Sequence, residues 1–366
     1  MSLRHRPTWV EVDLNAVRHN VGLLTPPSGA LMAVVKANGY GHGDVEVAAA
    51  AVEAGATWLG VALAEEGLRL RAAGIRAPIL VLSELPPGAE AEALSADLTP
   101  TLYTEEGLAR ITKAAAGRPV AVHVKVDTGM HRVGVYPPEA TAAFLDRVAA
   151  AGLRLDGLFT HFATAGEDEL LVAEQLALFG KIVEDVRAAG HAPRLLHAAN
   201  TAAIILHPEA HLDLVRAGIG IYGLLPEPGV GEGLGLRPAL TWRSAVTLVK
   251  RLPAGARTSY GQRYRLERDA WVATVPVGYA DGYPRVLSSQ ADVLIGGRRC
   301  RVAGNVTMDQ LIVDCGEAQP APGQEVVLLG RQGDGIVTAD ELAGLAGTIA
   351  YEIVTGIGER VPRGFI

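Results

Sequence analysis

Short apolar runs alternate with longer amphipathic segments from about residue 30 to residue 223. The longer segments carry apolar residues at helical spacing, with Glu or Pro near the start and Gly after the end, and they include 64–73, 105–116, 138–151 and 169–189. The apolar runs cover 31–35, 58–61, 79–82, 98–102, 120–126, 157–159, 194–196 and 212–215. Because a helical crossover returns the chain to the same end of a sheet, this alternation predicts parallel pairing.

Eight such strand–helix units in about two hundred residues fit a closed (β/α)8 barrel of the TIM type. The alternative is an open doubly wound sheet, which usually carries a glycine-rich phosphate turn after its first strand. Here the first run is followed instead by Lys-Ala-Asn-Gly-Tyr-Gly-His at 36–42. We therefore predict an N-terminal barrel.

The pattern changes after Gly223. Residues 224–240 are rich in Pro and Gly and predict a linker. Val- and Thr-rich runs separated by Gly turns follow, as is typical of antiparallel β structure, with one helix at 338–346. We predict a barrel domain over 1–235 and a mainly antiparallel β domain over 236–366. The strand-like segment at about 8–12 is also able to pack with the second domain.

Composition narrows the class of protein. The net charge of −7 gives no electrostatic reason to expect a nucleic-acid partner. Charged residues break the apolar stretches before they could span a bilayer, and no apolar run follows the basic start, so we expect no membrane segment, no secretory signal and a cytoplasmic location. Cys300 and Cys315 lack metal-ligand spacing and predict buried free thiols in a reducing compartment rather than a metal site.

Two of the five lysines follow predicted barrel strands, where catalytic groups of this fold lie. Lys36 comes after the first run and Lys125 lies near the end of the fifth. A lysine at such a position is either a solvated rim charge or a catalytic amine, because desolvation lowers its pKa and permits a Schiff base.

A candidate anion site follows the seventh and eighth runs. Asn200 and Thr201 open a short helical pattern, which presents backbone N–H groups and a hydroxyl, although Asn200 is equally explained as an ordinary N-cap. Gly218 and Ile219 permit close backbone approach to a phosphate, which barrels often bind here. An amine on the first strand and an anion site after the last two are what pyridoxal phosphate requires.

Arg216 bears on the chemistry of such a cofactor. A guanidinium stays protonated, so beside the pyridine nitrogen it only donates a hydrogen bond and leaves that nitrogen unprotonated. The ring is then a weaker electron sink, which favours simple proton transfer over transamination, β-elimination or decarboxylation. The alternative for Arg216 is a salt bridge at the edge of the core.

Several motifs together resemble the bacterial alanine racemases and follow the order of that family: AVVKANGYGHG (33–43), VKVDTGMHRVG (124–134), THFA (160–163), HAANTAA (197–203), VRAGIGIYG (215–223), SYGQRY (259–264), VPVGYADGYPR (275–285) and VTMDQ (306–310). The resemblance implies a barrel followed by a β domain, bound pyridoxal phosphate and a homodimer with shared active sites. It also implies interconversion of L- and D-alanine, which supplies D-alanine for cell-wall peptidoglycan.

The same resemblance implies the two catalytic bases. Lys36 would hold the cofactor covalently and serve as the base for the D-enantiomer, and Tyr260 would serve the L-enantiomer from the partner subunit. Racemisation needs this pair, because a proton leaves one face of a planar centre and another arrives on the opposite face. The alternative for Tyr260 is a surface or turn tyrosine beside Gly261.

The remaining roles are also implied by the resemblance. Leu82 and His161 would surround the ring, with His161 supporting Arg216. The contacts to the cofactor phosphate would come from Tyr40, Asn200, Thr201, Gly218, Ile219 and Tyr351. Arg132 and the backbone at Met308 would hold the substrate carboxylate.

Lys125 matches a lysine that is often carbamylated in the family, and a carbamate there would be an anion able to position Arg132. Tyr279 and Tyr351 would narrow the entrance to a methyl-sized side chain. Thr307 and Asn305 depart from a frequent Cys and Arg, which affects the lining of that entrance.

Three other functions fit parts of these observations. A barrel-type pyridoxal-phosphate decarboxylase usually needs a Cys-Asp pair in the β domain, whereas here Asp314 precedes Cys315. A cofactor carrier made of the barrel alone needs neither a β domain nor Tyr260. A racemase acting on Lys or Arg is typically exported and would carry a signal peptide.

Overall fold

The computed structural model describes residues 6–27 and 29–366, so residues 1–5, where the predicted barrel domain begins, lie outside the described residues. The chain divides into two compact units. The barrel unit comprises Ala16–Gly39 and Gly43–Arg237. The β unit comprises the described residues up to Asn15, Tyr40–His42 and Pro238–Ile366.

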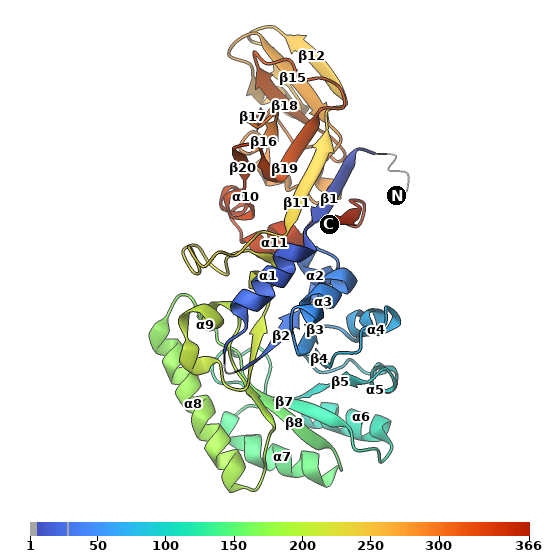
Figure 1. Ribbon diagram of the computed structural model, residues 1–366, viewed down its shortest axis with the longest axis vertical. Helices are drawn as coiled ribbons and strands as arrows, with labels where there is room; N and C mark the ends of the chain where they lie inside the picture. Colours follow the sequence, from blue (N-terminus) through green and yellow to red (C-terminus); the bar gives the residue numbers. More distant parts are fainter. Residues whose placement is uncertain (1–5, 28) are drawn as a thin grey trace. The chain divides into compact units, whose positions relative to one another are not determined.

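The barrel unit contains a parallel barrel with a strand at each of the eight predicted runs, which confirms the predicted fold class (Figure 1). The strands are β2 (Ala30–Val34), β3 (Trp58–Val61), β4 (Ile79–Val81), β5 and β6 (Leu98–Thr99 and Thr101–Leu102), β7 (Ala121–Lys125), β8 (Arg154–Phe159), β9 (Leu195–His197) and β10 (Leu214–Ala217). Pro100 separates β5 from β6 because proline has no N–H to donate. Backbone bonds from Asp213 to Leu196 and from Arg216 to Ala199 join β10 to β9.

Helices cover the outside of the barrel (Figure 1). They are α1 (Leu14–Leu24), α3 (Asp44–Glu53), α4 (Ala64–Ala72), α5 (Glu90–Ser95), α6 (Glu105–Ala115), α7 (Thr141–Ala150), α8 (Glu169–Ala188) and α9 (Thr201–Leu206), with single turns η1 (Pro138–Ala140), η2 (Pro208–Ala210) and η3 (Ile219–Tyr222). The side chains of Thr104 and Asp168 cap α6 and α8 by accepting from backbone N–H groups of the first turn. Inside the barrel, Met32, Trp58 and Phe159 belong to one buried cluster.

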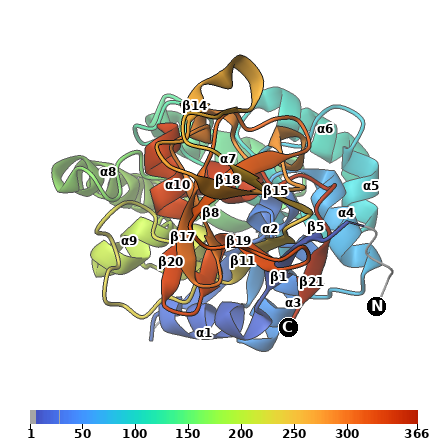
Figure 2. The same ribbon diagram turned by 90° about the horizontal axis from the view of Figure 1, so that it is seen from above.

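The β unit is built on a ten-stranded sheet with the order β12-β15-β18-β17-β16-β19-β11-β1-β21, and β20 pairs with β19. Its strands are β1 (Thr8–Val12), β11 (Leu240–Ala245), β12 (Leu248–Leu252), β15 (Ala270–Val275), β16 (Asp292–Ile295), β17 (Arg298–Val302), β18 (Leu311–Gly316), β19 (Glu325–Gln332), β20 (Gly335–Val337) and β21 (Arg363–Phe365). All pairs are antiparallel except β1 with β21. Figure 2 shows β19, β11 and β1 side by side.

Smaller elements complete the β unit. Strands β13 (Arg257–Thr258) and β14 (Tyr264–Arg265) form a hairpin around the turn η4 (Tyr260–Gln262), and η5 (Tyr279–Asp281) and η6 (Arg285–Leu287) follow β15. Helices α10 (Ala339–Ala346) and α11 (Ala350–Thr355) pack against each other. In the described part of the chain, no helix is both long and apolar enough to cross a membrane.

Candidate active site

Lys36 follows β2 and begins a left-handed turn, labelled α2 (Lys36–Tyr40), in which Ala37 and Asn38 have φ of 52° and 53°. Such a conformation costs a residue with a Cβ roughly 1–2 kcal/mol. The buried carboxylate of Glu66 fixes the turn: it accepts the Ala37 N–H at 2.7 Å and the Ala62 N–H at 2.8 Å. The backbone that carries Lys36 is therefore held in a strained position, as is common at functional sites.

Lys36 and Lys125 lie in an electropositive part of the barrel unit. Burial and then the charges of Arg216 and Arg132 lower the pKa of Lys125 to about 7. Burial and then Arg132 lower the pKa of Lys36, and Glu66 partly offsets this. A lowered pKa raises the neutral fraction of each amine at a given pH, and a neutral amine is nucleophilic and can accept a proton.

Arg216, in β10, has 4 % of its surface exposed, and four neutral acceptors hold its guanidinium. Its Nη2 donates to the carbonyls of Thr160 and Ala198 at 2.8 Å, and lies 3.1 Å from Nδ1 of His161. Its Nη1 lies 2.9 Å from Nδ1 of His197. Burial lowers the pKa of Arg216 to about 9, so the guanidinium still carries its charge at neutral pH.

A line of buried histidines that was not predicted from the sequence lies behind Arg216. Nε2 of His197 lies 3.0 Å from Nδ1 of His123, whose Nε2 is 3.8 Å from Asp156. Burial, then the charge of Arg216, holds the pKa of His197 well below its usual range, so this imidazole is neutral. Because His197 Nδ1 accepts from Arg216, its Nε2 carries the proton and donates to His123.

The sequence pattern could have indicated that His123 faces the interior of the barrel. It lies two residues before Lys125 in the same strand, and alternate residues of a strand share a face. Gly157 in β8 leaves room for the imidazole, since a Cβ at that glycine would lie 2.3 Å from Nδ1 of His123. The period of two could therefore have predicted an inward-facing histidine.

The candidate anion site is a compact turn joined to α9. Asn200 Oδ1 accepts the Ala203 N–H at 3.0 Å, so this residue is the N-cap of α9. Thr201 Oγ1 accepts the N–H groups of Gly218 and Gly220 at 3.0 and 3.4 Å. A Cβ at Gly220 would lie 2.7 Å from the Thr201 methyl, so the close approach requires glycine.

Four further residues lie at the strand ends of the barrel or in the loops that follow them. Ile219 is buried in η3, and Tyr222 of the same turn donates its hydroxyl to the carbonyl of Val34 at 2.9 Å, which joins the eighth strand's turn to β2. Leu82 follows β4 and packs on the buried cluster inside the barrel. Arg132 is exposed in the loop after β7, where its charge acts on both lysines.

Tyr260 lies in the β unit and has 75 % of its side chain surface exposed. Its loop is nonetheless held firmly. Ser259 has φ of 60°, and its Oγ donates to the carbonyl of Asn305 at 2.7 Å. Asn305 Nδ2 in turn donates to the carbonyl of Tyr260 at 2.9 Å. An exposed phenol is therefore presented on a fixed backbone.

Two other groups of predicted residues lie in the β unit. The N–H groups of Tyr279 and Ala280 donate to the carbonyls of Thr307 and Met308 at 3.0 Å, so the two predicted entrance segments lie side by side. The rings of Tyr40 and Tyr351 are 6.1 Å apart between centroids. Tyr40 thus folds with the β unit, although it is four residues from Lys36 in sequence.

The structure therefore assembles the predicted residues in two groups. The barrel unit brings together Lys36, Leu82, Lys125, Arg132, His161, Asn200, Thr201, Arg216, Gly218 and Ile219. The β unit carries Tyr40, Tyr260, Tyr279, Met308 and Tyr351. Among the described residues, no cluster of three His, Cys, Asp or Glu side chains is placed to hold a metal ion.

A barrel with amines of lowered pKa, a buried guanidinium and a glycine turn, followed by a β domain, defines a class of amino-acid-transforming enzymes. Family models place the chain within it. Residues 12–226 match the alanine racemase N-terminal domain and residues 239–365 match the alanine racemase C-terminal domain. The chain belongs to the alanine racemase family, whose members are pyridoxal-phosphate-dependent isomerases, and the predicted resemblance is confirmed.

Individual relatives agree with the family models. The alanine racemase of Symbiobacterium thermophilum is 52% identical over 364 residues, which cover 98% of this chain and 97% of the relative. A crystal structure of the enzyme from D-cycloserine-producing Streptomyces lavendulae has a TM-score of 0.94 at 42% identity and covers 99% of this chain and 98% of that chain. The Bacillus anthracis enzyme with bound L-Ala-P has a TM-score of 0.94 at 39% identity, with 100% and 96% coverage.

Proposed function

We propose that this chain interconverts L- and D-alanine with pyridoxal phosphate and so supplies D-alanine for peptidoglycan. The observation that carries the proposal is the buried Arg216, fixed by neutral acceptors at the strand ends where the amines of lowered pKa also lie. The residues fit the cofactor: Lys36 offers the amine, Arg216 a donor for the pyridine nitrogen, and the Thr201–Gly218 turn a phosphate site. Tyr40, Leu82, His161, Asn200, Ile219 and Tyr351 complete the proposed cofactor contacts.

The proposed chemistry divides a proton transfer between two side chains. Bound pyridoxal phosphate withdraws electrons from the α-carbon of the amino acid. Lys36 Nζ then accepts or returns the proton on one face, and the phenol oxygen of Tyr260 does so on the other. Arg132 and the backbone of Met308 hold the substrate carboxylate, while Tyr279 and Tyr351 limit the side chain to about the size of a methyl group.

Arg216 restricts the outcome of this reaction. Its guanidinium is fixed by four hydrogen bonds and keeps its charge at neutral pH, so it would donate a hydrogen bond to the cofactor's pyridine nitrogen and would leave that nitrogen unprotonated. A weaker electron sink favours return of the proton over loss of other groups.

Covalent labelling tests the cofactor proposal. The purified protein should absorb as a lysine-bound pyridoxal derivative, and borohydride should fix that label to Lys36. Lys36→Ala should lose both the label and the conversion of L-alanine followed by circular dichroism. Lys181→Ala, which changes a lysine on the outer helix α8, should retain both. A colourless protein that no label reaches at Lys36, even with added cofactor, contradicts the proposal.

We also propose a homodimer in which the β domain (236–366) of each chain completes the partner's site, because an exposed Tyr260 on a fixed loop suits insertion into another molecule. Mixing two inactive variants tests this. Dimers that combine Lys36→Ala with Tyr260→Phe chains contain one intact shared site, so random mixing should restore about a quarter of the wild-type activity. No recovery in verified mixed dimers contradicts shared sites. The cytoplasmic location stays a prediction.

A further inference from the structure

Cys300 and Cys315 face each other on neighbouring strands of the β unit. In the antiparallel pair β17–β18, Arg301 pairs with Asp314, and each step along one strand is matched by a step back along the other. The next pair along the ladder is therefore Cys300 with Cys315. They are fifteen positions apart in sequence, and only the strand register brings them together.

The hydrogen-bond pattern defines the type of this pair. The N–H of Ala303 donates to the carbonyl of Ile312 at 2.7 Å, so that pair is hydrogen-bonded. Hydrogen-bonded and non-hydrogen-bonded pairs alternate along an antiparallel ladder, which makes Cys300 and Cys315 a non-hydrogen-bonded pair. The Cα atoms of such pairs are about 4.5 Å apart, within the range that a disulfide spans.

Both thiols are reduced and lie on the buried face of the sheet, with 3 % and 6 % of their surface exposed. A hydrogen bond between the two thiols lowers the pKa of Cys300, to which the charge of Arg298 also contributes, and raises the pKa of Cys315. The pairing of β18 with β15 changes register at Cys315, because Gly316 pairs with Trp271 and Asp314 pairs with Val272. Cys315 therefore has no paired residue on β15.

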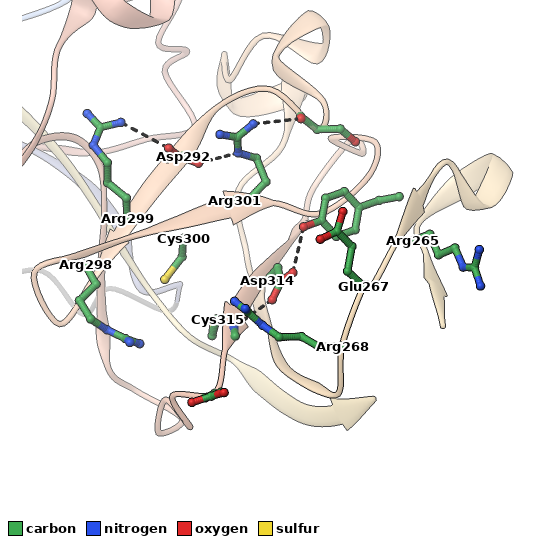
Figure 3. A pocket seen from close by; sticks show the side chains of 14 residues that line it. Arg265, Glu267, Arg268, Asp292, Arg298, Arg299, Cys300, Arg301, Asp314 and Cys315 are labelled. Atoms are coloured by element: carbon green, nitrogen blue, oxygen red, sulfur yellow. Dashed lines mark hydrogen bonds and ion pairs between the residues drawn. The ribbon is translucent and has the colours of Figure 1, made fainter. Parts of the chain in front are cut away.

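The two cysteines contribute to the wall of a surface pocket of about 740 Å³ (Figure 3). Its other charged lining residues are Arg265, Glu267, Arg268, Asp292, Arg298, Arg299, Arg301, Asp314 and Glu317. Arg299 and Arg301 are ion-paired with carboxylates and lie on the opposite face of β17 from Cys300. Arg298 lies two residues before Cys300 on the same face, and its charge contributes to the lowered pKa of that thiol. Arg298 therefore places a positive charge on the face of the sheet that carries the two thiols.

We propose that Cys300 and Cys315 are a thiol–disulfide exchange site that closes to a cross-strand disulfide when a low-molecular-weight anionic disulfide enters this pocket. The Cys300 thiolate attacks one sulfur of the incoming disulfide, breaks its S–S bond and releases one thiol. Cys315 then loses its proton to solvent and attacks the Cys300 sulfur, which forms the protein disulfide and releases the second thiol. The two cysteines are oxidised, and the incoming disulfide is reduced to two thiols.

Oxidation with glutathione disulfide tests this site in the full-length protein with its cofactor. After treatment and alkylation under denaturing conditions, the number of alkylated cysteines should fall from two to none. Digestion should then yield one peptide pair linked through Cys300 and Cys315 within one chain. If both thiols stay alkylatable in the folded protein while the guanidine-unfolded chain is oxidised, or if the links join two chains, the proposal is wrong.

Single-cysteine variants test the order of attack. Cys315→Ser should accumulate a glutathione adduct at Cys300, because the second step is blocked. Cys300→Ser should react more slowly, because burial and the charge of Asp314 still raise the pKa of the remaining Cys315 thiol. Equal rates, or faster reaction of Cys300→Ser, would overturn the assignment of Cys300 as the attacking residue. The readout is mass spectrometry of the protein, so it stands apart from racemase activity and from the proposed function.

A change of charge tests the role of the pocket. Arg298→Gln should slow oxidation by glutathione disulfide and leave oxidation by the uncharged hydroxyethyl disulfide unchanged. Added salt should reduce the difference between the two reagents, because it screens exposed charges. Lys250→Gln, which removes a positive charge from β12, serves as the control. If the Arg298 variant slows both reagents alike, the pocket does not select an anion and the proposal fails.

Discussion

The barrel unit and the β unit present their candidate residues in opposite ways. In the barrel unit, Lys125 and Arg216 are buried, with 6 % and 4 % exposure, and burial shifts the pKa of both. In the β unit, Tyr260 and Met308 are 75 % and 53 % exposed, although their backbones are firmly hydrogen-bonded. Burial and nearby charges thus shift the pKa values of the candidate residues in the barrel unit, whereas the β unit exposes its candidate side chains to solvent. Such exposure is expected where a second protein surface completes the site.

Among the substitutions that should keep the cofactor bound, Tyr260→Phe should have the largest effect on activity. Tyr260→Phe should keep the cofactor spectrum and the stability of the protein, because the side chain contributes little to packing in the β unit. It should lower racemisation about 10²–10⁴-fold, unequally for proton exchange from the two enantiomers, because only one face loses its base. Deuterium exchange into L- and D-alanine measures this asymmetry.

Tyr136→Phe is the matched control, because it removes an exposed hydroxyl from the barrel unit. It should leave both exchange rates unchanged. Fast exchange from both enantiomers in Tyr260→Phe would contradict a two-base mechanism, and it would remove the functional contrast between the units.

Replacement of a buried histidine should mainly affect stability. His197→Phe leaves a donor of Arg216 and Nδ1 of His123 without their partner in a fully buried place. We expect the free energy of unfolding to fall by about 2–4 kcal/mol, measured by urea denaturation. His211→Phe removes a half-buried imidazole–carbonyl bond of the same unit and should cost about 1 kcal/mol. Equal losses of unfolding free energy in the two variants would contradict a larger contribution from His197 than from His211.

The lowered pKa of Lys125 predicts how stability depends on pH. Because the folded pKa is about 7 and the unfolded value about 10.5, the unfolded chain binds more protons between these values. The contribution of Lys125 to stability should therefore rise with pH over this window, by at most about 1.4 kcal/mol per pH unit, and be lowest below pH 7.

Lys125→Met isolates that contribution. Urea unfolding of both proteins in carbon-dioxide-free buffer should show the wild type gaining stability relative to the variant from pH 7 to pH 10. Parallel curves would contradict the lowered pKa. Added ¹³C-bicarbonate should produce a carbamate NMR signal in the wild type that the variant lacks, since a neutral amine reacts with carbon dioxide; its absence would contradict the proposed carbamylation.

The loop bond of Asn305 should have the smallest effect. Asn305→Ala loses the hydrogen bond to the Tyr260 carbonyl, worth about 1 kcal/mol, and should slow racemisation up to roughly tenfold. The loss should show the same asymmetry between enantiomers as Tyr260→Phe, which a general loss of stability would not produce. Thr247→Ala, which removes an exposed hydroxyl–carbonyl bond of the same unit, should leave the rates unchanged.

Much of the architecture could be predicted from the sequence. The eight runs became the eight barrel strands, and Lys36 and Lys125 lie at strand ends as expected. The β domain was predicted less completely. For the residues after the linker, the sequence predicted Val- and Thr-rich strands without their pairing. The first two, β11 and β12, occupy distant positions in the sheet, and α11, which carries Tyr351, was not predicted. Antiparallel register depends on distant partners, whereas barrel strands follow their order in the chain.

The amino-acid sequence by itself determined the strand–helix alternation, the class of the barrel and the positions of the two lysines, because local periodicity and Gly punctuation encode them. Only the tertiary structure decided that His197 links Arg216 to His123, and that Tyr40, the last residue of the turn that begins at Lys36, lies beside Tyr351. These contacts join residues far apart in the chain, and their energies arise from burial and register, which no local pattern specifies.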